Sequence, residues 1–319
     1  MKKLTAALMC VATLGLAAPA WAQDTYPSRP ITIVVPFGPG SGTDIGARLI
    51  GQKLSDAMGQ PVTIDNKPGA NGVIAADIVA NAKPDGYTLI MGTNSTHGSN
   101  PALVRDLRYD PVKSFEPINR VGIFSSVIVV NPSLPIKNLA ELIAYGKKQE
   151  LTLGTGNTSG IVMGETFARQ VGIKVLRVPF KSNPDAIREV VAGRVNMMFT
   201  DVASAKWLLL SGSVRPIAMT TAQRSTVIPE VPTAAEAGVA DYDLAGWIGL
   251  FAPAGTPKPI LEKLNAEVTK ALMLPDVRER LLSLGAEPAA MPLPQFVTWS
   301  RQEVTKWVRL VKEAGIEPQ

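Results

Sequence analysis

A glycine-rich turn between an apolar run and a helical pattern is the segment of this chain best suited to hold an anion. Residues 31–35 are apolar or β-branched, Gly38, Gly40 and Gly42 follow, and a helical pattern begins at residue 43. Glycines let a ligand approach the backbone, and a helix start presents unpaired N–H groups and the positive end of its dipole. This arrangement suits a carboxylate or phosphate. It serves equally as a plain strand-to-helix connector of an α/β domain.

A second glycine-rich turn occupies residues 154–160, with the sequence Gly-Thr-Gly-Asn-Thr-Ser-Gly. It has one residue too many between its last glycines for a dinucleotide fingerprint, and it lacks the lysine of a phosphate loop. If the two turns belong to different lobes, a ligand between them meets two helix starts at once. Closure of the lobes then follows from contacts that exist only when they meet.

Polar side chains near these turns have alternative roles. Residues 93–96 end an apolar run with hydroxyl and amide groups, which suits either a polar ligand loop or a solvated turn. A carboxylate at Asp44 would repel an anion, so we expect it to accept backbone N–H groups at the helix start or to orient a water, ahead of direct contact. Asp201 either accepts from a ligand ammonium or hydroxyl or caps the helix that begins at Val202. Lys181 is the one nearby cation, and exposed loop lysines are usually solvated.

The residue inventory disfavours an enzyme. His97 is the single histidine and Cys10 the single cysteine, so a thiol nucleophile or a histidine-rich metal site cannot be assembled in the mature chain. No Gly-x-Ser-x-Gly elbow is present, and no local spacing nominates a carboxylate pair. We expect His97 to be a loop residue near a cleft, and we expect no metal and no cofactor.

The first 22 residues resemble an export signal. Lys2 and Lys3 precede an apolar run at residues 4–18 that is short for a transmembrane helix, and Ala20-Trp21-Ala22 forms a small-x-small cleavage site. Cys10 would leave with this segment, so the mature chain has neither a disulfide nor a thiol. The sequence predicts a soluble exported protein, periplasmic in a Gram-negative host.

Charge and length indicate two globular units and no nucleic-acid partner. Without Lys2 and Lys3, the 32 basic residues become 30 against 27 acidic ones, and these are spread over many short segments. No block of like charges, heptad series or low-complexity tract appears. The mature length of 297 residues is large for one hydrophobic core and comfortable for two.

Short apolar runs alternate with amphipathic helical patterns, which predicts mixed or mostly parallel α/β architecture. Cap signals occur at Asn138, before a helical pattern, and at Thr233, in a turn that Gly238 closes; each is followed three residues later by glutamate. The expected strands are residues 31–35, 62–65, 88–91, 127–130, 151–154, 175–178, 197–200, 216–220 and 247–252. The expected helices are residues 43–58, 73–82, 139–149, 160–171, 184–192, 202–210, 257–272, 275–284 and 295–314.

The last three helices have no strand pattern among them, so we expect them to pack against the first lobe. The chain then crosses between lobes twice, near residues 123–126 and 245–247. The predicted first lobe is residues 23–124 plus 248–319, and the second is residues 125–247. Each lobe is expected to be a sheet flanked by helices.

Five ordered motifs give the chain a specific resemblance to a known family. They are residues 35–48, residues 66–72 (Asn-Lys-Pro-Gly-Ala-Asn-Gly), residues 83–90 (Lys-Pro-Asp-Gly-Tyr-Thr-Leu-Ile), residues 229–238 and residues 252–259. Together they resemble the tripartite tricarboxylate transporter receptors, also called Bug receptors, over essentially the whole mature chain. The resemblance implies a monomeric two-lobed periplasmic binding protein of type II-like fold that closes on a small mono-, di- or tricarboxylate, aromatic ones included. It also implies delivery of that ligand to membrane permease subunits.

Members of this family hold the ligand mainly through backbone N–H groups and ordered water from loops of both lobes. Carried onto this sequence, the first-lobe contribution is Phe37, Gly38, Pro39, Gly40, Ser41, Gly42, Thr43, Asp44, Thr93, Asn94 and Ser95. The second-lobe contribution is Thr155, Gly156, Asn157, Thr158, Ser159, Phe180, Lys181, Ser182 and Asp201.

The chain departs from the usual family pattern near these loops. Many members have glycine, tyrosine and glycine where this chain has Ser41, Phe180 and Ser182, and often a histidine near the position of Val162. Ligand identity therefore does not transfer from a relative. A signalling receptor that presents its closed form to a sensor kinase is the alternative function, since it needs the same ligand-dependent closure.

Overall fold

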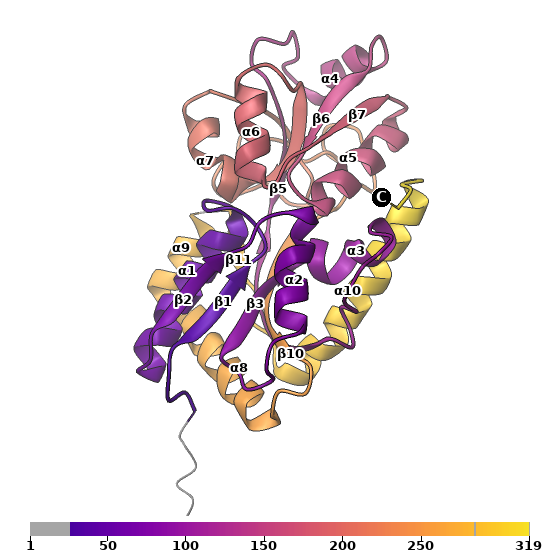
Figure 1. Ribbon diagram of the computed structural model, residues 1–319. Helices are drawn as coiled ribbons and strands as arrows, with labels where there is room; N and C mark the ends of the chain where they lie inside the picture. Colours follow the sequence, from indigo (N-terminus) through magenta and orange to yellow (C-terminus); the bar gives the residue numbers. More distant parts are fainter. Residues whose placement is uncertain (1–25, 284, 319) are drawn as a thin grey trace, which may run out of the picture.

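A computed structural model describes residues 26–283 and 285–318. It contains two separate β-sheets, each flanked by helices, which form the lower and upper parts of the molecule in Figure 1. The predicted α/β fold is confirmed. The predicted export signal, residues 1–22, lies outside the described residues.

The first sheet has six strands in the order β11-β4-β10-β3-β1-β2. One side of this sheet is parallel, because β1 pairs in parallel with both β2 and β3, whereas β10 runs antiparallel to β3 and β4. The strands are β1 (Ile31–Val35), β2 (Val62–Asn66), β3 (Thr88–Thr93), β4 (Phe115–Phe124), β10 (Gly246–Pro253) and β11 (Ala286–Pro288).

The second sheet has five strands in the order β7-β6-β8-β5-β9. Strand β6 pairs in parallel with β7 and β8, and β5 runs antiparallel to β8 and β9. The strands are β5 (Ser126–Val130), β6 (Leu151–Thr155), β7 (Val175–Pro179), β8 (Met197–Asp201) and β9 (Arg215–Met219). The chain enters this sheet between β4 and β5 and leaves it between β9 and β10.

Helices cover both sheets, and several begin with a side-chain cap. Ser41, Asn138, Asn157 and Asp201 each accept a hydrogen bond from a backbone N–H in the first turn of the helix that follows. The helices are α1 (Gly42–Met58), α2 (Val73–Ala80), α3 (Asn100–Leu103), α4 (Leu139–Gly146), α5 (Thr158–Val171), α6 (Asn183–Val191), α7 (Val202–Leu210), α8 (Lys258–Met273), α9 (Pro275–Leu282) and α10 (Leu293–Glu313), with short η1 (Ala70–Gly72) and η2 (Ser95–Ser99).

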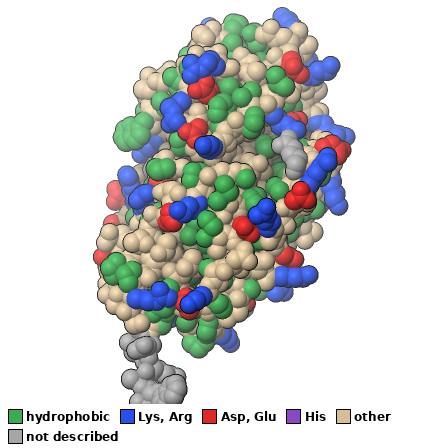
Figure 2. All heavy atoms as spheres, in the orientation of Figure 1, with side chains coloured by type: hydrophobic (Ala, Val, Ile, Leu, Met, Phe, Trp, Pro, Cys, Tyr) green, Lys and Arg blue, Asp and Glu red, His purple; other side chains and the backbone are tan. Residues whose placement is uncertain are grey.

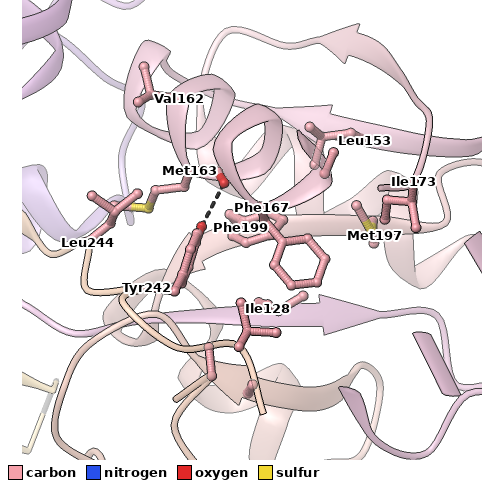
Figure 3. Packing of buried hydrophobic residues seen from close by; sticks show 14 of the residues in the cluster. Ile128, Leu153, Val162, Met163, Phe167, Ile173, Met197, Phe199, Tyr242 and Leu244 are labelled. Atoms are coloured by element: carbon pink, nitrogen blue, oxygen red, sulfur yellow. Dashed lines mark hydrogen bonds between the residues drawn. The ribbon is translucent and has the colours of Figure 1, made fainter. Parts of the chain in front are cut away.

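Helix α5 packs against the second sheet and contributes to its hydrophobic core. Phe167 of α5 lies against Phe199 of β8 and Tyr242, with ring centroids 5.6 and 5.9 Å away (Figure 3). The buried Tyr242 hydroxyl donates to the carbonyl of Met163 at 2.6 Å. This contact fastens the first half of α5 to the connection between β9 and β10.

The C-terminal helices partly follow the prediction that they pack on the first lobe. Leu264 of α8 and Leu281 of α9 are buried in the core of the first sheet. Helix α10, yellow in Figure 1, runs further, and Trp307 and Val311 join the hydrophobic cluster that contains Phe167 of the second lobe. This helix therefore connects the two lobes.

The visible face in Figure 2 mixes basic and acidic side chains without a large field of one sign. Within residues 26–283 and 285–318, no helix has both the length and the apolar character needed to span a membrane.

Candidate functional site

A small cavity lies between the two sheets, where four helices begin. Its volume is about 50 Å³. Helices α1, α5, α6 and α7 each contribute their first residue or their cap to the cavity lining. The cavity is lined by Phe37, Gly42, Thr43, Thr93, Asn94, Ser95, Phe124, Ser126, Asn157, Ser159, Gly160, Met163, Asn183, Phe199, Thr200, Asp201, Gly246, Trp247 and Ile248.

The start of α1 reaches across to the second lobe. The Gly42 N–H donates to the Ser204 hydroxyl at 3.2 Å. A Cβ at Gly42 would lie 2.7 Å from Asp201 Oδ1, so glycine is required for this approach. Within the described part of the chain, the N–H of Thr43 donates to no acceptor, which leaves it available beside the cavity.

The start of α5 is joined to the loop that follows β3. The Ser95 and Ser159 hydroxyls share a hydrogen bond of 2.7 Å, and the Ser159 N–H donates to Ser95 Oγ at 3.2 Å. The Ser99 hydroxyl donates to Thr158 Oγ1 at 2.8 Å. Asn157 caps the helix, and its first turn contains no acidic residue. The positive end of α5 is therefore not cancelled by a carboxylate of its own first turn.

Asn94 supplies a hydrogen-bond donor that has no partner. Its side chain is 3% exposed, and its Oδ1 accepts from the Trp247 N–H at 3.3 Å. The Nδ2 atom has no hydrogen-bond partner among the described residues, although it is buried. A buried unpaired donor is costly. Because Asn94 lines the cavity, a ligand acceptor at this position would remove that cost.

Asp201 both caps α7 and lines the cavity. Its Oδ1 accepts from the Ser204 N–H at 2.7 Å, and its Oδ2 accepts from the Ser204 hydroxyl and from Asn183 Nδ2, both at 2.9 Å. It is the one charged residue of the described cavity lining. The capping alternative is thus present in the structure, and a ligand contact remains a prediction.

Asp44 faces its own loop and is absent from the described cavity lining. Its carboxylate accepts from the Gly40 N–H at 3.0 Å, from Arg48 Nε at 3.1 Å and from Asn66 Nδ2 at 3.0 Å. Burial raises the pKa of Asp44, but the hydrogen bonds from Arg48, Gly40 and Asn66 outweigh it and lower the pKa below its usual value. Asp44 therefore stabilises the glycine-rich turn by accepting a backbone N–H, which is the first of the roles expected for it.

The structure brings together nine of the residues predicted to bind the ligand. They come from both predicted lobes and are Phe37, Gly42, Thr43, Thr93, Asn94, Ser95, Asn157, Ser159 and Asp201. The other predicted residues lie outside the lining, and they are Gly38, Pro39, Gly40, Ser41, Asp44, Thr155, Gly156, Thr158, Phe180, Lys181 and Ser182.

Some of these outlying residues form the rim. A Cβ at Gly38 would lie 3.1 Å from the Ser182 hydroxyl, so the two loops nearly touch. Lys181 is exposed to solvent, and Phe180 packs at the edge of the hydrophobic cluster of α6 and α7. His97 follows the polar loop but is fully buried, stacked on Phe251 at 4.0 Å, and burial lowers its pKa to about 3.

Gly160, which ends the second glycine-rich turn predicted to bind the ligand, also lines the cavity. Nine lining residues were not predicted from the sequence. Most belong to strands or first helical turns, where an aromatic residue usually indicates a core position and a small polar residue a helix cap. They are Phe124, Ser126, Met163, Asn183, Phe199, Thr200, Gly246, Trp247 and Ile248. Thr200 and Ser126 are polar residues at the ends of apolar strand patterns, and this was the sequence signal that could have indicated a place in the cavity.

Two α/β lobes with helix starts converging on a cavity between them define a solute-binding receptor. The chain belongs to the tripartite tricarboxylate transporter family receptors, because the model of that family matches residues 46–316.

Relatives match nearly the whole chain. It is 33% identical over 310 residues to Protein BugT of Bordetella pertussis, covering 96% of this chain and 95% of BugT. The structure of R. palustris Rpa4515 with adipate has a TM-score of 0.90 and 36% identity, covering 92% of this chain and 100% of Rpa4515. MatC of Rhodopseudomonas palustris with bound malate has a TM-score of 0.85 and 35% identity, covering 90% and 100%.

Proposed function

We propose that this chain is a periplasmic receptor that captures a small carboxylate between two lobes and delivers it to the membrane subunits of a tripartite tricarboxylate transporter. In this proposal residues 1–22 direct export, the lobes are residues 23–124 plus 248–319 and residues 125–247, and the mature receptor acts as a monomer. The adipate and malate named with two structural relatives support this ligand class.

The observation that carries the proposal is the unpaired Asn94 Nδ2 in the cavity wall. It lies in the same cavity as Thr43, whose N–H is unpaired in the described structure, and as the first turn of α5. A carboxylate accepts several hydrogen bonds at once and is favoured at the positive end of a helix. These neutral donors replace the hydration of the anion without a basic side chain.

Closure of the lobes is supported by the hydrogen bonds that join them. Ser95 and Ser99 of the first predicted lobe bond Ser159 and Thr158 of the second, and Gly42 bonds Ser204. These contacts exist only when the lobes meet, so a ligand that holds both helix starts stabilises the closed form. A membrane permease subunit or a sensor kinase would bind the same closed form. The family supports the transporter as partner.

Receptor action is favoured over catalysis because Asp201 is the one titratable side chain of the described lining. General acid–base or nucleophilic catalysis requires further positioned groups. The family is defined as receptors rather than enzymes.

Thermal-shift screening and titration calorimetry with organic acids test the proposal. We expect at least one aliphatic or aromatic carboxylate to raise the melting temperature and to bind with 1:1 stoichiometry, because a ligand of the folded state stabilises it. Asn94→Asp keeps the acceptor for Trp247 N–H and replaces the free donor with a negative oxygen, so affinity should fall at least about a hundredfold. Gln149→Glu makes the same amide-to-acid change on an exposed residue and should bind like the wild type.

Failure of every acid, with binding of a neutral sugar or a metal ion, would overturn the proposal. Equal affinity in Asn94→Asp and Gln149→Glu would remove Asn94 from the site.

A further inference from the structure

The one charged side chain in the described lining of the cavity is negative. Within the described lining there is no lysine, arginine or histidine, and Asp201 contributes a negative charge. The nearest basic residues along the chain do not compensate it there, because Lys181 is exposed and Lys206 Nζ donates to the Ser283 carbonyl at 2.6 Å. A bound carboxylate therefore shares its cavity with a like charge.

Asp201 has one acceptor position that the protein leaves open. An ionised carboxylate offers about four lone-pair sites. Three are filled, one on Oδ1 by the Ser204 N–H and two on Oδ2 by the Ser204 hydroxyl and Asn183 Nδ2. The remaining site is on Oδ1, the atom that would lie 2.7 Å from a Cβ at Gly42.

Two polar side chains of the lining have opposite hydrogen-bonding character. Asn94 presents a free donor, whereas Asp201 presents a free acceptor with negative charge. The lining also includes the apolar side chains of Phe124, Met163 and Phe199. A ligand that satisfies both polar side chains carries an acceptor for Asn94 and a donor for Asp201.

We propose that Asp201 is a specificity-determining residue that selects acids bearing a hydroxyl or amino group in addition to the carboxylate. The carboxylate lies at Asn94, and the hydroxyl or amino group donates to Asp201 Oδ1. This inference rests on the proposed function, since it requires a carboxylate ligand in this cavity. It predicts discrimination among acids of the same skeleton.

Matched ligand sets test the inference by titration calorimetry at pH 7.5. Succinate, malate and aspartate share one four-carbon skeleton and differ by hydrogen, hydroxyl and ammonium. Benzoate, 4-hydroxybenzoate and 4-aminobenzoate form the aromatic set. In at least one set, the members with a donor should bind the wild type about tenfold or more tightly than the member without one, because a charged acceptor strengthens the hydrogen bond.

The variant Asp201→Asn separates specificity from folding. Asparagine caps helices about as well as aspartate, so α7 and the fold should be retained, as circular dichroism and the melting temperature would show. The preference for the ammonium or hydroxyl member should shrink at least about fivefold, and the donor-free acid should bind no worse than before. Asp243→Asn makes the same change in an exposed loop and should keep the wild-type preference.

The outcomes distinguish this inference from the proposed function. Binding of acids without any preference for a donor would overturn the inference and leave the proposed function standing. A wild-type preference that persists unchanged in Asp201→Asn would also overturn it. Failure of all acids would refute the proposed function, and the inference with it.

Discussion

Removing the Glu303 carboxylate should loosen one wall of the cavity from the C-terminal helix. Glu303 of α10 is 7% exposed, and its Oε2 accepts from the indole N–H groups of Trp247 and Trp307 at 2.8 and 2.9 Å. Trp247 lines the cavity, and Trp307 packs against Gly98 behind the polar loop. One buried carboxylate therefore holds two tryptophans from different parts of the chain.

The substitution Glu303→Leu leaves both buried indole donors without their acceptor. Each stranded donor costs roughly 1–3 kcal/mol, and the removal of a buried charge returns part of that cost, so we expect a net loss of roughly 3 kcal/mol. The ion pair with Lys306 adds little, because it is 3.7 Å long and the lysine is 43% exposed. At about 2–3 °C per kcal/mol, the melting temperature should fall by roughly 6–9 °C.

Two further variants make this prediction specific. Glu303→Gln keeps a carbonyl oxygen that accepts from both indoles, so its melting temperature should fall by no more than about half as much. Glu313→Leu changes a glutamate of the same helix that is 62% exposed, and its melting temperature should stay within about 2 °C of the wild type. Differential scanning fluorimetry gives these shifts, and calorimetry should show weaker ligand binding in Glu303→Leu alone. Equal shifts in Glu303→Leu and Glu313→Leu would refute the reasoning.

Two other predictions follow from single positions. Gly42→Val places a Cβ about 2.7 Å from Asp201 Oδ1 and should lower ligand affinity at least about tenfold by calorimetry, because it holds the lobes apart. Gly40→Ala is strained at φ +81° and should cost about 1 kcal/mol of stability, but a Cβ there meets no atom within 4 Å, so ligand affinity should stay within about threefold. A larger loss of affinity in Gly40→Ala than in Gly42→Val would contradict this explanation. Burial lowers the pKa of His97 to about 3, so the unfolded chain takes up the proton first as the pH falls below 6.5. This group should therefore lower the free energy of unfolding by about 2 kcal/mol at pH 5 relative to pH 7.5, as measured by chemical denaturation. The free energy of unfolding of His97→Gln should lack this part of the pH dependence. Parallel pH profiles for the wild type and His97→Gln would refute the prediction.

Local signals in the sequence predicted most of the elements that surround the cavity. Asn138 accepts from the Glu141 N–H at 2.9 Å and caps α4, and Thr233 exchanges hydrogen bonds of 3.1 and 2.8 Å with Glu236 in a turn. The reciprocal hydrogen bonds predicted at both positions are therefore present. The turn before α1 and the turn before α5 were also recognisable, because glycines and caps act within a few residues. These signals require no knowledge of the tertiary structure.

Long-range pairing set the features that the sequence did not predict. Strand β4 was missed because Pro117, Asn119 and Arg120 interrupt its apolar pattern, and it is stabilised by pairing with β10 more than a hundred residues away. That pairing places Gly246 opposite Phe124, and both residues line the cavity. Aromatic residues in strand patterns usually belong to a hydrophobic core. The local sequence therefore did not distinguish cavity-lining residues such as Phe124 from ordinary core residues.

The caps of α1, α5 and α7 explain how the cavity can accept an anion without a basic side chain. Ser41 and Asn157 are neutral caps, and the acidic residue in the first turn of α1, Asp44, is paired with Arg48. The positive ends of α1 and α5 therefore remain directed at the cavity, whereas Asp201 cancels that of α7. The choice of cap residue thus leaves the start of α5 electropositive and makes the start of α7 electronegative. A ligand with one anionic end and one donor end has a single favourable orientation between them.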